Sequence, residues 1–199
     1  SIVDAVYAAG IAVVFSASNE GPDDSTIGNP PMENWDLVRM FSVGALNGNI
    51  PSFTIAGFSS RGPTVCGGEG ALLIKPEVSA PGVSVRSCEP DGQYGLKSGT
   101  SMSAPHVSGA LLLLKEAFPY LSGEELMLAL YFSCTDLGIA GEDNTYGRGL
   151  ISLPAAYHYL MDQGHVPVPP VQSELDVALL QILSEDRYCE STATVEALV

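Results

Sequence analysis

The order of apolar and polar residues predicts alternating helices and strands along the chain. Residues 1–9 carry apolar side chains at helical spacing, and Gly10 ends that pattern. Residues 11–17 form a continuous apolar run, which is typical of a strand buried on both faces. A helix, a short turn and a buried strand are half of a βαβ unit, so this region predicts an α/β fold with a parallel sheet. The other predicted elements are a strand at residues 40–45, a hairpin formed by residues 83–87 and 94–97, and a helix with a capping box of Ser122 and Glu125.

The rest of the chain is organised around a segment of small residues. Residues 98–110 read Ser-Gly-Thr-Ser-Met-Ser-Ala-Pro-His-Val-Ser-Gly-Ala, and four leucines follow at once. Gly99 permits a tight turn, and Pro105 is tolerated in the first turn of a helix. The helix predicted here is apolar on nearly every face over residues 107–114, so we expect it to be buried in the middle of a domain.

Ser101 falls at the start of this predicted helix. Backbone N–H groups at a helix N-terminus have no partner inside the helix and favour negative charge. A serine hydroxyl there is well placed to attack a carbonyl group and to have the resulting oxyanion stabilised. The simpler interpretation is that the serine caps the helix, since serine is among the preferred N-cap residues.

Two segments resemble one enzyme family, the subtilisin-like serine proteases. Residues 99–109 resemble the nucleophile motif of these proteases, which implies that Ser101 is the nucleophile. Residues 10–22, Gly-Ile-Ala-Val-Val-Phe-Ser-Ala-Ser-Asn-Glu-Gly-Pro, resemble the segment whose asparagine donates a hydrogen bond to the oxyanion, which implies that role for Asn19. A side-chain amide suits the task because it is neutral and carries two N–H donors. Taken alone, Asn19 would be read as a turn residue.

The same resemblance implies a substrate-binding pocket. Residues 27–30, Ile-Gly-Asn-Pro, resemble the bottom of the family's specificity pocket, so Gly28 and Asn29 are predicted to contact substrate. A glycine floor leaves depth for a large apolar or aromatic substrate side chain. Ser18 stands where the family usually has glycine and is expected to narrow the pocket wall, while Glu20 at the rim offers a partner for Lys or Arg.

The resemblance covers about residues 1–160, and residues 58–63 and 75–85 look most like bacillopeptidase-F-type members. It implies a subtilisin-like three-layer α/β/α fold with a mostly parallel sheet, incomplete at its N-terminal side. In the family, an Asp block and a His-Gly block precede the oxyanion asparagine, and nothing in this sequence matches either block. We therefore expect the C-terminal half of a catalytic domain, left open as a partial gene, a boundary chosen for expression, or one chain of a nicked two-chain protein.

A serine nucleophile needs a general base, and the three histidines offer no good one. His106 lies five positions after Ser101, about 140° around a helix axis, so its imidazole is expected to point away from the hydroxyl and to serve helix packing. His158 and His165 lie near a proline-rich stretch, where a surface role is expected. The catalytic Asp and His are therefore expected from a missing N-terminal half, which is a predicted partner of this chain.

Two functions from different classes follow. The first is a serine endopeptidase that hydrolyses peptide bonds through an acyl-enzyme at Ser101. The second is a noncatalytic, subtilase-like binding scaffold that kept the serine block and lost the base. The presence of both Ser101 and Asn19 in matching context favours the protease. An esterase of the α/β-hydrolase type is disfavoured because residues 99–103 do not read G-x-S-x-G.

Composition narrows the partners. A net charge of −15 argues against nucleic acid and anionic membrane surfaces, which require Lys and Arg. The apolar runs fall far short of the ~20 residues of a membrane span. The resemblance implies a protein or peptide substrate, a secreted or cell-envelope location and no cofactor for the chemistry. It is compatible with a structural Ca²⁺, but the sequence locates no metal site.

The cysteines and the C-terminal tail leave alternatives open. The four cysteines show no C-x-x-C spacing, so zinc is not expected. Cys66 and Cys88 lie in turn-rich stretches and are candidates for a disulfide if the protein is exported, while Cys134 is expected to be a buried free thiol. Residues 161–199 comprise a proline-rich linker and an acidic tail with a short helix predicted from Ser173. This region is interpreted as the start of another domain or as an arm that packs on the body.

Overall fold

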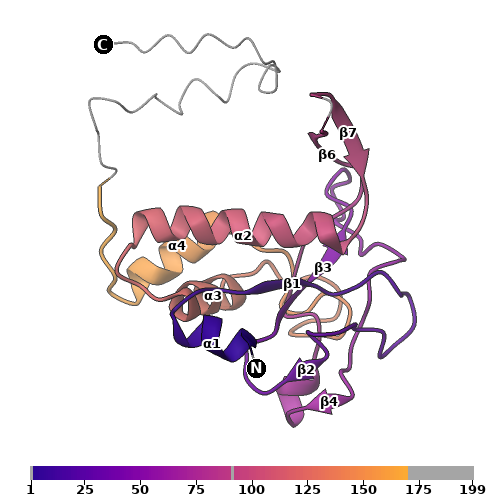
Figure 1. Ribbon diagram of the computed structural model, residues 1–199, viewed down its shortest axis with the longest axis horizontal. Helices are drawn as coiled ribbons and strands as arrows, with labels where there is room; N and C mark the ends of the chain where they lie inside the picture. Colours follow the sequence, from indigo (N-terminus) through magenta and orange to yellow (C-terminus); the bar gives the residue numbers. More distant parts are fainter. Residues whose placement is uncertain (1, 91, 170–199) are drawn as a thin grey trace.

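The structure is a computed structural model and describes residues 2–90 and 92–169. Its centre is a sheet of three parallel strands in the order β1-β3-β5 (Figure 1). These strands are β1 (Val14–Ser16), β3 (Phe41–Leu46) and β5 (Val78–Pro81). The predicted α/β fold with a mostly parallel sheet is confirmed.

The remaining elements lie around this sheet. The helices are α1 (Ile2–Ala8), α2 (Thr100–Ala117), α3 (Gly123–Phe132), α4 (Leu153–Asp162) and the 3-10 helix η1 (Gly70–Leu73). The other strands are β2 (Glu33–Asn34), which pairs with β4 (Cys66–Gly67), and β6 (Val85–Cys88), which forms an antiparallel hairpin with β7 (Tyr94–Lys97). The hairpin predicted from the sequence is therefore confirmed.

One apolar core joins the sheet to the helices. α2 packs along all three strands of the sheet, and α3 and α4 pack against α2 and against each other. The core residues include Val43 and Val78 from the strands, Val107 and Leu114 from α2, and Leu130 from α3. This packing holds the N-terminus of α2 at one end of the sheet, beside the β6–β7 hairpin (Figure 1).

α2 is not buried on every side. Leu112 and Leu113 are 72% and 51% exposed, whereas Leu111 and Leu114 are buried against the core. The helix predicted over residues 107–114 is confirmed, and within the described residues only one side of it is buried. The apolar pattern gave the helix correctly, but nothing among the described residues covers its outer face.

β1 also differs from the prediction. The strand begins at Val14 and its residues are only half-buried, and Ile11 is 55% exposed. β1 stands at the end of the strand order, and within the described residues it pairs only with β3. An apolar groove of about 290 Å³ runs beside it, lined by Gly10, Ile11, Ala12, Val14, Ser108, Leu111, Leu112, Lys115, Gly123 and Leu126.

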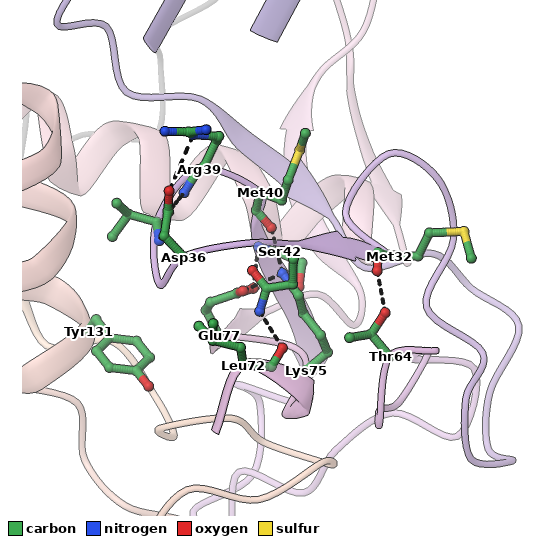
Figure 2. A network of polar contacts seen from close by, with 12 residues as sticks. Met32, Asp36, Arg39, Met40, Ser42, Thr64, Leu72, Lys75, Glu77 and Tyr131 are labelled. Carbon is green, nitrogen blue, oxygen red and sulfur yellow. Dashed lines mark hydrogen bonds and ion pairs between the residues drawn. The ribbon is translucent and has the colours of Figure 1, made fainter. Parts of the chain in front are cut away.

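A buried ion pair joins β3 to the segment that leads into β5 (Figure 2). The side chain of Lys75 is fully buried, and its Nζ donates a hydrogen bond to the Met40 carbonyl oxygen at 2.7 Å and pairs with Glu77 Oε1. Glu77 Oε2 accepts hydrogen bonds from Ser42 N at 2.6 Å and Ser42 Oγ at 2.7 Å. Burial is the largest influence on both groups, since it raises the pKa of Glu77 and lowers the pKa of Lys75, while the ion pair opposes both changes.

The capping box at the start of α3 is present as predicted. Ser122 Oγ accepts a hydrogen bond from Glu125 N at 3.3 Å, and Glu125 Oε2 accepts one from Ser122 N at 2.7 Å. The hydrogen bonds that the Glu125 carboxylate accepts from Ser122 N and from Ser122 Oγ lower the pKa of Glu125.

The structure decides whether Cys66 and Cys88 form a disulfide. Cys66 is a free thiol, so the Cys66–Cys88 disulfide considered from the sequence is wrong. Cys66 lies in β4 beside β2, and Figure 1 shows this pair at the opposite end of the molecule from β6, which carries Cys88. Cys134 is free, its Sγ lies 3.2 Å from the Leu130 carbonyl oxygen, and burial raises the pKa of its thiol to about 12.

The helix predicted from Ser173 lies outside the described residues. Among the helices in residues 2–90 and 92–169, none has both the length and the apolar character needed to cross a bilayer.

Candidate active site

Ser101 is the second residue of α2 and is exposed. The N-cap of this helix is Gly99, so the serine does not cap the helix, and the simpler interpretation of the sequence is wrong. The N–H of Ser101 lies in the first helical turn, where no carbonyl one turn back is available to accept it. The hydroxyl and this N–H therefore lie together at the positive end of the helix.

The turn before Ser101 is attached to the sheet. Gly99 N donates to the Gly82 carbonyl oxygen at 2.8 Å, and Gly82 N donates to the Leu46 carbonyl oxygen at 2.9 Å. Leu46 is the last residue of β3, and Gly82 follows β5 directly. The start of α2 is thus fixed at the carboxyl ends of two parallel strands, the usual position of ligand sites in such sheets.

Asn19 reaches the same place from the end of β1. Its Oδ1 accepts two hydrogen bonds from Thr100, from the backbone N at 2.9 Å and from Oγ1 at 3.1 Å. Because a backbone N–H can only donate, the amide oxygen must face α2, and the two N–H donors on Nδ2 are left for another acceptor. A Cβ placed on Gly99 would lie 3.6 Å from Asn19 Nδ2 and 3.7 Å from Met102 Sδ. The amide therefore lies beside the first turn of α2, and its donors lie close to the residue before Thr100.

The loop that carries Asn19 is fastened to residues 58–60. Ser60 N donates to the Ser18 carbonyl oxygen at 3.1 Å, and Glu20 N donates to Ser60 Oγ at 3.0 Å. Gly21 N donates to the Phe58 carbonyl oxygen at 2.9 Å, and a Cβ on Gly21 would lie 2.2 Å from the Ser59 carbonyl oxygen. Only glycine fits this approach, which explains why the turn after Asn19 carries one.

Of the four predicted substrate-binding residues, Ser18 and Glu20 flank Asn19 in this loop, and Gly28 and Asn29 follow in the next segment. Gly28 N donates to the Ala17 carbonyl oxygen at 3.3 Å, which brings Gly28 against Ser18, and the Asn29–Pro30 peptide bond is cis. Glu20 and Asn29 are exposed. The structure therefore brings Ser18 and Gly28 into contact beside Asn19, and a role of these residues in binding substrate stays a prediction.

No histidine in the described part of the chain forms a hydrogen bond with Ser101. His106 Nδ1 lies 2.8 Å from the carbonyl oxygen of Met102, one turn back in α2. His165 packs against Tyr120, just beyond the C-terminus of α2. His158 is exposed on α4.

An open cavity of about 330 Å³ adjoins Ser101. Its lining is Val85, Arg86, Ser87, Ser101, Met102, Pro105 and His106. The cavity leaves open space beside Ser101. In residues 2–90 and 92–169, no three His, Cys, Asp or Glu side chains gather in a way that could hold a metal ion.

Thr100 is the functional candidate that the sequence analysis missed. It is fully buried and makes both hydrogen bonds that orient the Asn19 amide. The sequence position of Thr100 is the signal that could have identified it. Thr100 is the first residue of α2, so its N–H has no acceptor inside the helix and, together with the short side chain, can bond to a loop in front of the helix.

Comparison with known proteins decides the family. A model of the family described as "Subtilase family" matches residues 2–149. The chain belongs to the subtilase family. Subtilisin DY from Bacillus licheniformis is 40% identical over 156 residues, which make up 77% of this chain and 49% of that protein. Serine protease AprX from Bacillus subtilis (strain 168) is 34% identical over 168 residues, 75% of this chain and 36% of that protein.

Solved structures agree with this assignment. A psychrophilic protease matches with a TM-score of 0.65 and 30% identity, and Sphericase matches with a TM-score of 0.64 and 31% identity. Each match covers 75% of this chain and 50% of the solved chain. The chain thus has a subtilisin-like fold and spans about half the length, or less, of the relatives it matches. The finer likeness to bacillopeptidase-F-type members stays a prediction.

Proposed function

We propose that this chain carries the nucleophile and oxyanion donors of a serine endopeptidase. The observation that supports this most is the pair of hydrogen bonds from Thr100 to Asn19 Oδ1. They hold a neutral amide beside the helix turn that carries Ser101, with its Nδ2 donors free. An oxyanion site requires donors that are fixed before the charge develops, and this arrangement supports that role for Asn19.

The chemistry follows from these groups. Ser101 Oγ attacks the carbonyl carbon of a peptide bond, while its proton passes to a general base. The oxygen that becomes negatively charged accepts hydrogen bonds from Asn19 Nδ2 and from the N–H of Ser101. The protonated base then donates its proton to the amide nitrogen. The C–N bond breaks as the carbonyl re-forms, and the amine departs and leaves an ester on Ser101. Water then hydrolyses this acyl-enzyme with the same base and the same donors.

The base and its orienting carboxylate are proposed to come from an N-terminal half that is not part of these 199 residues. The chain spans 49% of subtilisin DY and 50% of the two solved chains, which leaves such a half to be supplied. Three features support this proposal: the edge of β1, the apolar groove beside it, and the exposed side chains of Leu112 and Leu113. An edge strand and an apolar patch of this kind normally require a partner.

The proposed division of the chain follows the same account. Residues 1–160 form the C-terminal part of the catalytic domain, and residues 161–199 form a linker and a tail. Protein or peptide is the proposed substrate, and a secreted or cell-envelope location accords with the subtilisins among the relatives. A structural calcium ion stays a proposal without assigned ligands.

Replacement of the nucleophile tests the proposal. In the complete protease, with both halves present, Ser101→Ala should leave only residual peptide hydrolysis, because the acyl-enzyme cannot form. Ser52→Ala is the control, since Ser52 is an exposed serine that belongs neither to the site around Ser101 nor to the apolar groove. Hydrolysis that survives in Ser101→Ala at the level of the control would show that Ser101 is not the nucleophile. Absence of hydrolysis in the unmutated complete protein would favour the noncatalytic scaffold.

A further inference from the structure

Ser18 has an unusual backbone conformation for a residue with a side chain. Its φ is +86°, in the left-handed region that favours glycine. Hydrogen bonds on both sides hold this conformation. The Ser18 carbonyl oxygen accepts from Ser60 N, while Ala17 N donates to the Val43 carbonyl oxygen and the Ala17 carbonyl oxygen accepts from Gly28 N. Such strain persists where the surrounding structure enforces it, and it is concentrated at functional sites.

The side chain of Ser18 lies over Gly28. A Cβ placed on Gly28 would lie 2.1 Å from Ser18 Oγ and 3.1 Å from Ser18 Cβ, and no other atom would come within 4 Å of it. The Ser18 side chain therefore occupies the position that a Cβ on Gly28 would take. The depth that a glycine offers at this position is taken up by the serine hydroxymethyl group.

Both residues lie next to the oxyanion donor. Ser18 directly precedes Asn19, and Gly28 is bonded to Ala17 through its N–H. A substrate whose carbonyl oxygen faces Asn19 Nδ2 places the side chain on the acyl side of its scissile bond close to this pair. Ser18 Oγ is the atom nearest to the position of a Cβ on Gly28, so the hydroxyl lies in this space.

We propose that Ser18 is the specificity-determining residue of this protease and closes the pocket above Gly28 to large side chains. Residues with small side chains, Ala and Ser first, are accepted on the acyl side of the cleaved bond, while Leu and Phe are discriminated against. This reverses the preference for large residues that a glycine floor alone would predict. The inference rests on the proposed endopeptidase function.

Matched substrates and one substitution test the inference. Peptide anilides that differ only in the acyl-side residue are compared in the complete protease, with Ala and Phe as the two extremes. The wild type should show kcat/KM for Ala about tenfold or more above that for Phe, and Ser18→Gly should move this ratio toward Phe by about tenfold or more. Because glycine is relaxed at φ +86°, this variant is expected to fold at least as well as the wild type.

A second serine at positive φ provides the control. Ser25 has a φ of +59°, is exposed, and does not approach Gly28. Ser25→Gly should therefore leave the Ala-to-Phe ratio unchanged, and Ser18→Ala, which keeps Cβ but removes the hydroxyl, should give an intermediate ratio.

Labelling by a fluorophosphonate separates the two possible failures. If Ser101 is labelled and peptides are cleaved, but Phe is preferred by the wild type or the ratio is the same in Ser18→Gly, the role of Ser18 is wrong and the protease stands. If Ser101 is not labelled in the complete protein, the endopeptidase function fails, and the specificity inference fails with it.

Discussion

Asn19 and Thr100 are 81 positions apart in the sequence and are joined by two hydrogen bonds, at 2.9 Å and 3.1 Å, both accepted by the Asn19 amide oxygen. The loop after β1 is thereby tied to the first residue of α2. This contact fixes which side of the amide faces the helix, and hence which side is free to stabilise an oxyanion.

Removal of the amide should impair the chemical step. Asn19→Ala in the complete protease should lower kcat by about 10²–10³ with little change in KM, because the donor acts mainly in the transition state. Steady-state kinetics on one peptide substrate measure both constants. Asn49→Ala, at an exposed loop asparagine bonded to Val83, is the control and should leave kcat unchanged. An unaltered kcat in Asn19→Ala would remove this residue from the mechanism.

Thr100 should act through Asn19 rather than on the substrate. Thr100→Val removes the Oγ1 hydrogen bond and keeps the one from the backbone, so kcat should fall by roughly fivefold, the equivalent of about 1 kcal/mol, with KM unchanged. Combined with Asn19→Ala, the substitution should have little further effect, because the group that it positions is gone. Fully additive losses in the double variant would show that Thr100 acts independently of Asn19. Thr135→Val, at an exposed threonine, is the control.

The buried ion pair of Figure 2 should matter for stability. Lys75→Met leaves the Glu77 carboxyl group buried without its partner, and we expect the free energy of unfolding to fall by about 3–5 kcal/mol. The control is Lys97→Met, since Lys97 pairs with Glu89 at 3.1 Å but is 61% exposed, and such surface pairs contribute about 0–1 kcal/mol. Denaturant unfolding of the complete protease compares the two variants. Equal losses would contradict the importance of burial.

The contribution of the α3 capping box to the free energy of unfolding should depend on pH. Ser122→Ala should cost about 0.5–2 kcal/mol of unfolding free energy at neutral pH. Because the folded-state pKa of Glu125 is lowered, its contribution is present above its ordinary pKa and is lost as the pH falls through the folded pKa. The cost of Ser122→Ala should therefore shrink in acid.

The cap of α4 provides the comparison. Ser152 Oγ accepts from Ala155 N at 3.4 Å, and no carboxylate completes a box there. Ser152→Ala should cost less than Ser122→Ala, and its cost should not change with pH across the acid range. A Ser122→Ala cost that is constant with pH would contradict the role of the Glu125 carboxylate.

The sequence predicted the elements well and the contacts between them poorly. Periodicity identified α1, the hairpin and the capping box, and motif resemblance singled out Ser101 and Asn19, because these signals lie within short segments. The pairing of Asn19 with Thr100 could not be read in advance, since it depends on how separate segments approach in space. The resemblance placed Ser18 and Gly28 in one pocket, but it did not give the distance between them. The apolar pattern of residues 107–114 predicted a helix, but a pattern does not say what covers each face, and Leu112 and Leu113 are left exposed.

The central claim is that Ser101 and Asn19 form half of a protease site whose base lies in another segment. Its most direct test is labelling of Ser101 by a fluorophosphonate, located by peptide mass spectrometry, with residues 1–199 alone and with the N-terminal half of a catalytic domain added in trans. Alone, the chain should not be labelled, because a serine hydroxyl without a base has little nucleophilicity near neutral pH. It should also self-associate in light scattering, because the edge of β1 and the apolar groove are uncovered. Addition of the second half should bring labelling at Ser101 and a soluble complex. A monomeric chain that is labelled at Ser101 without the second half would contradict the account.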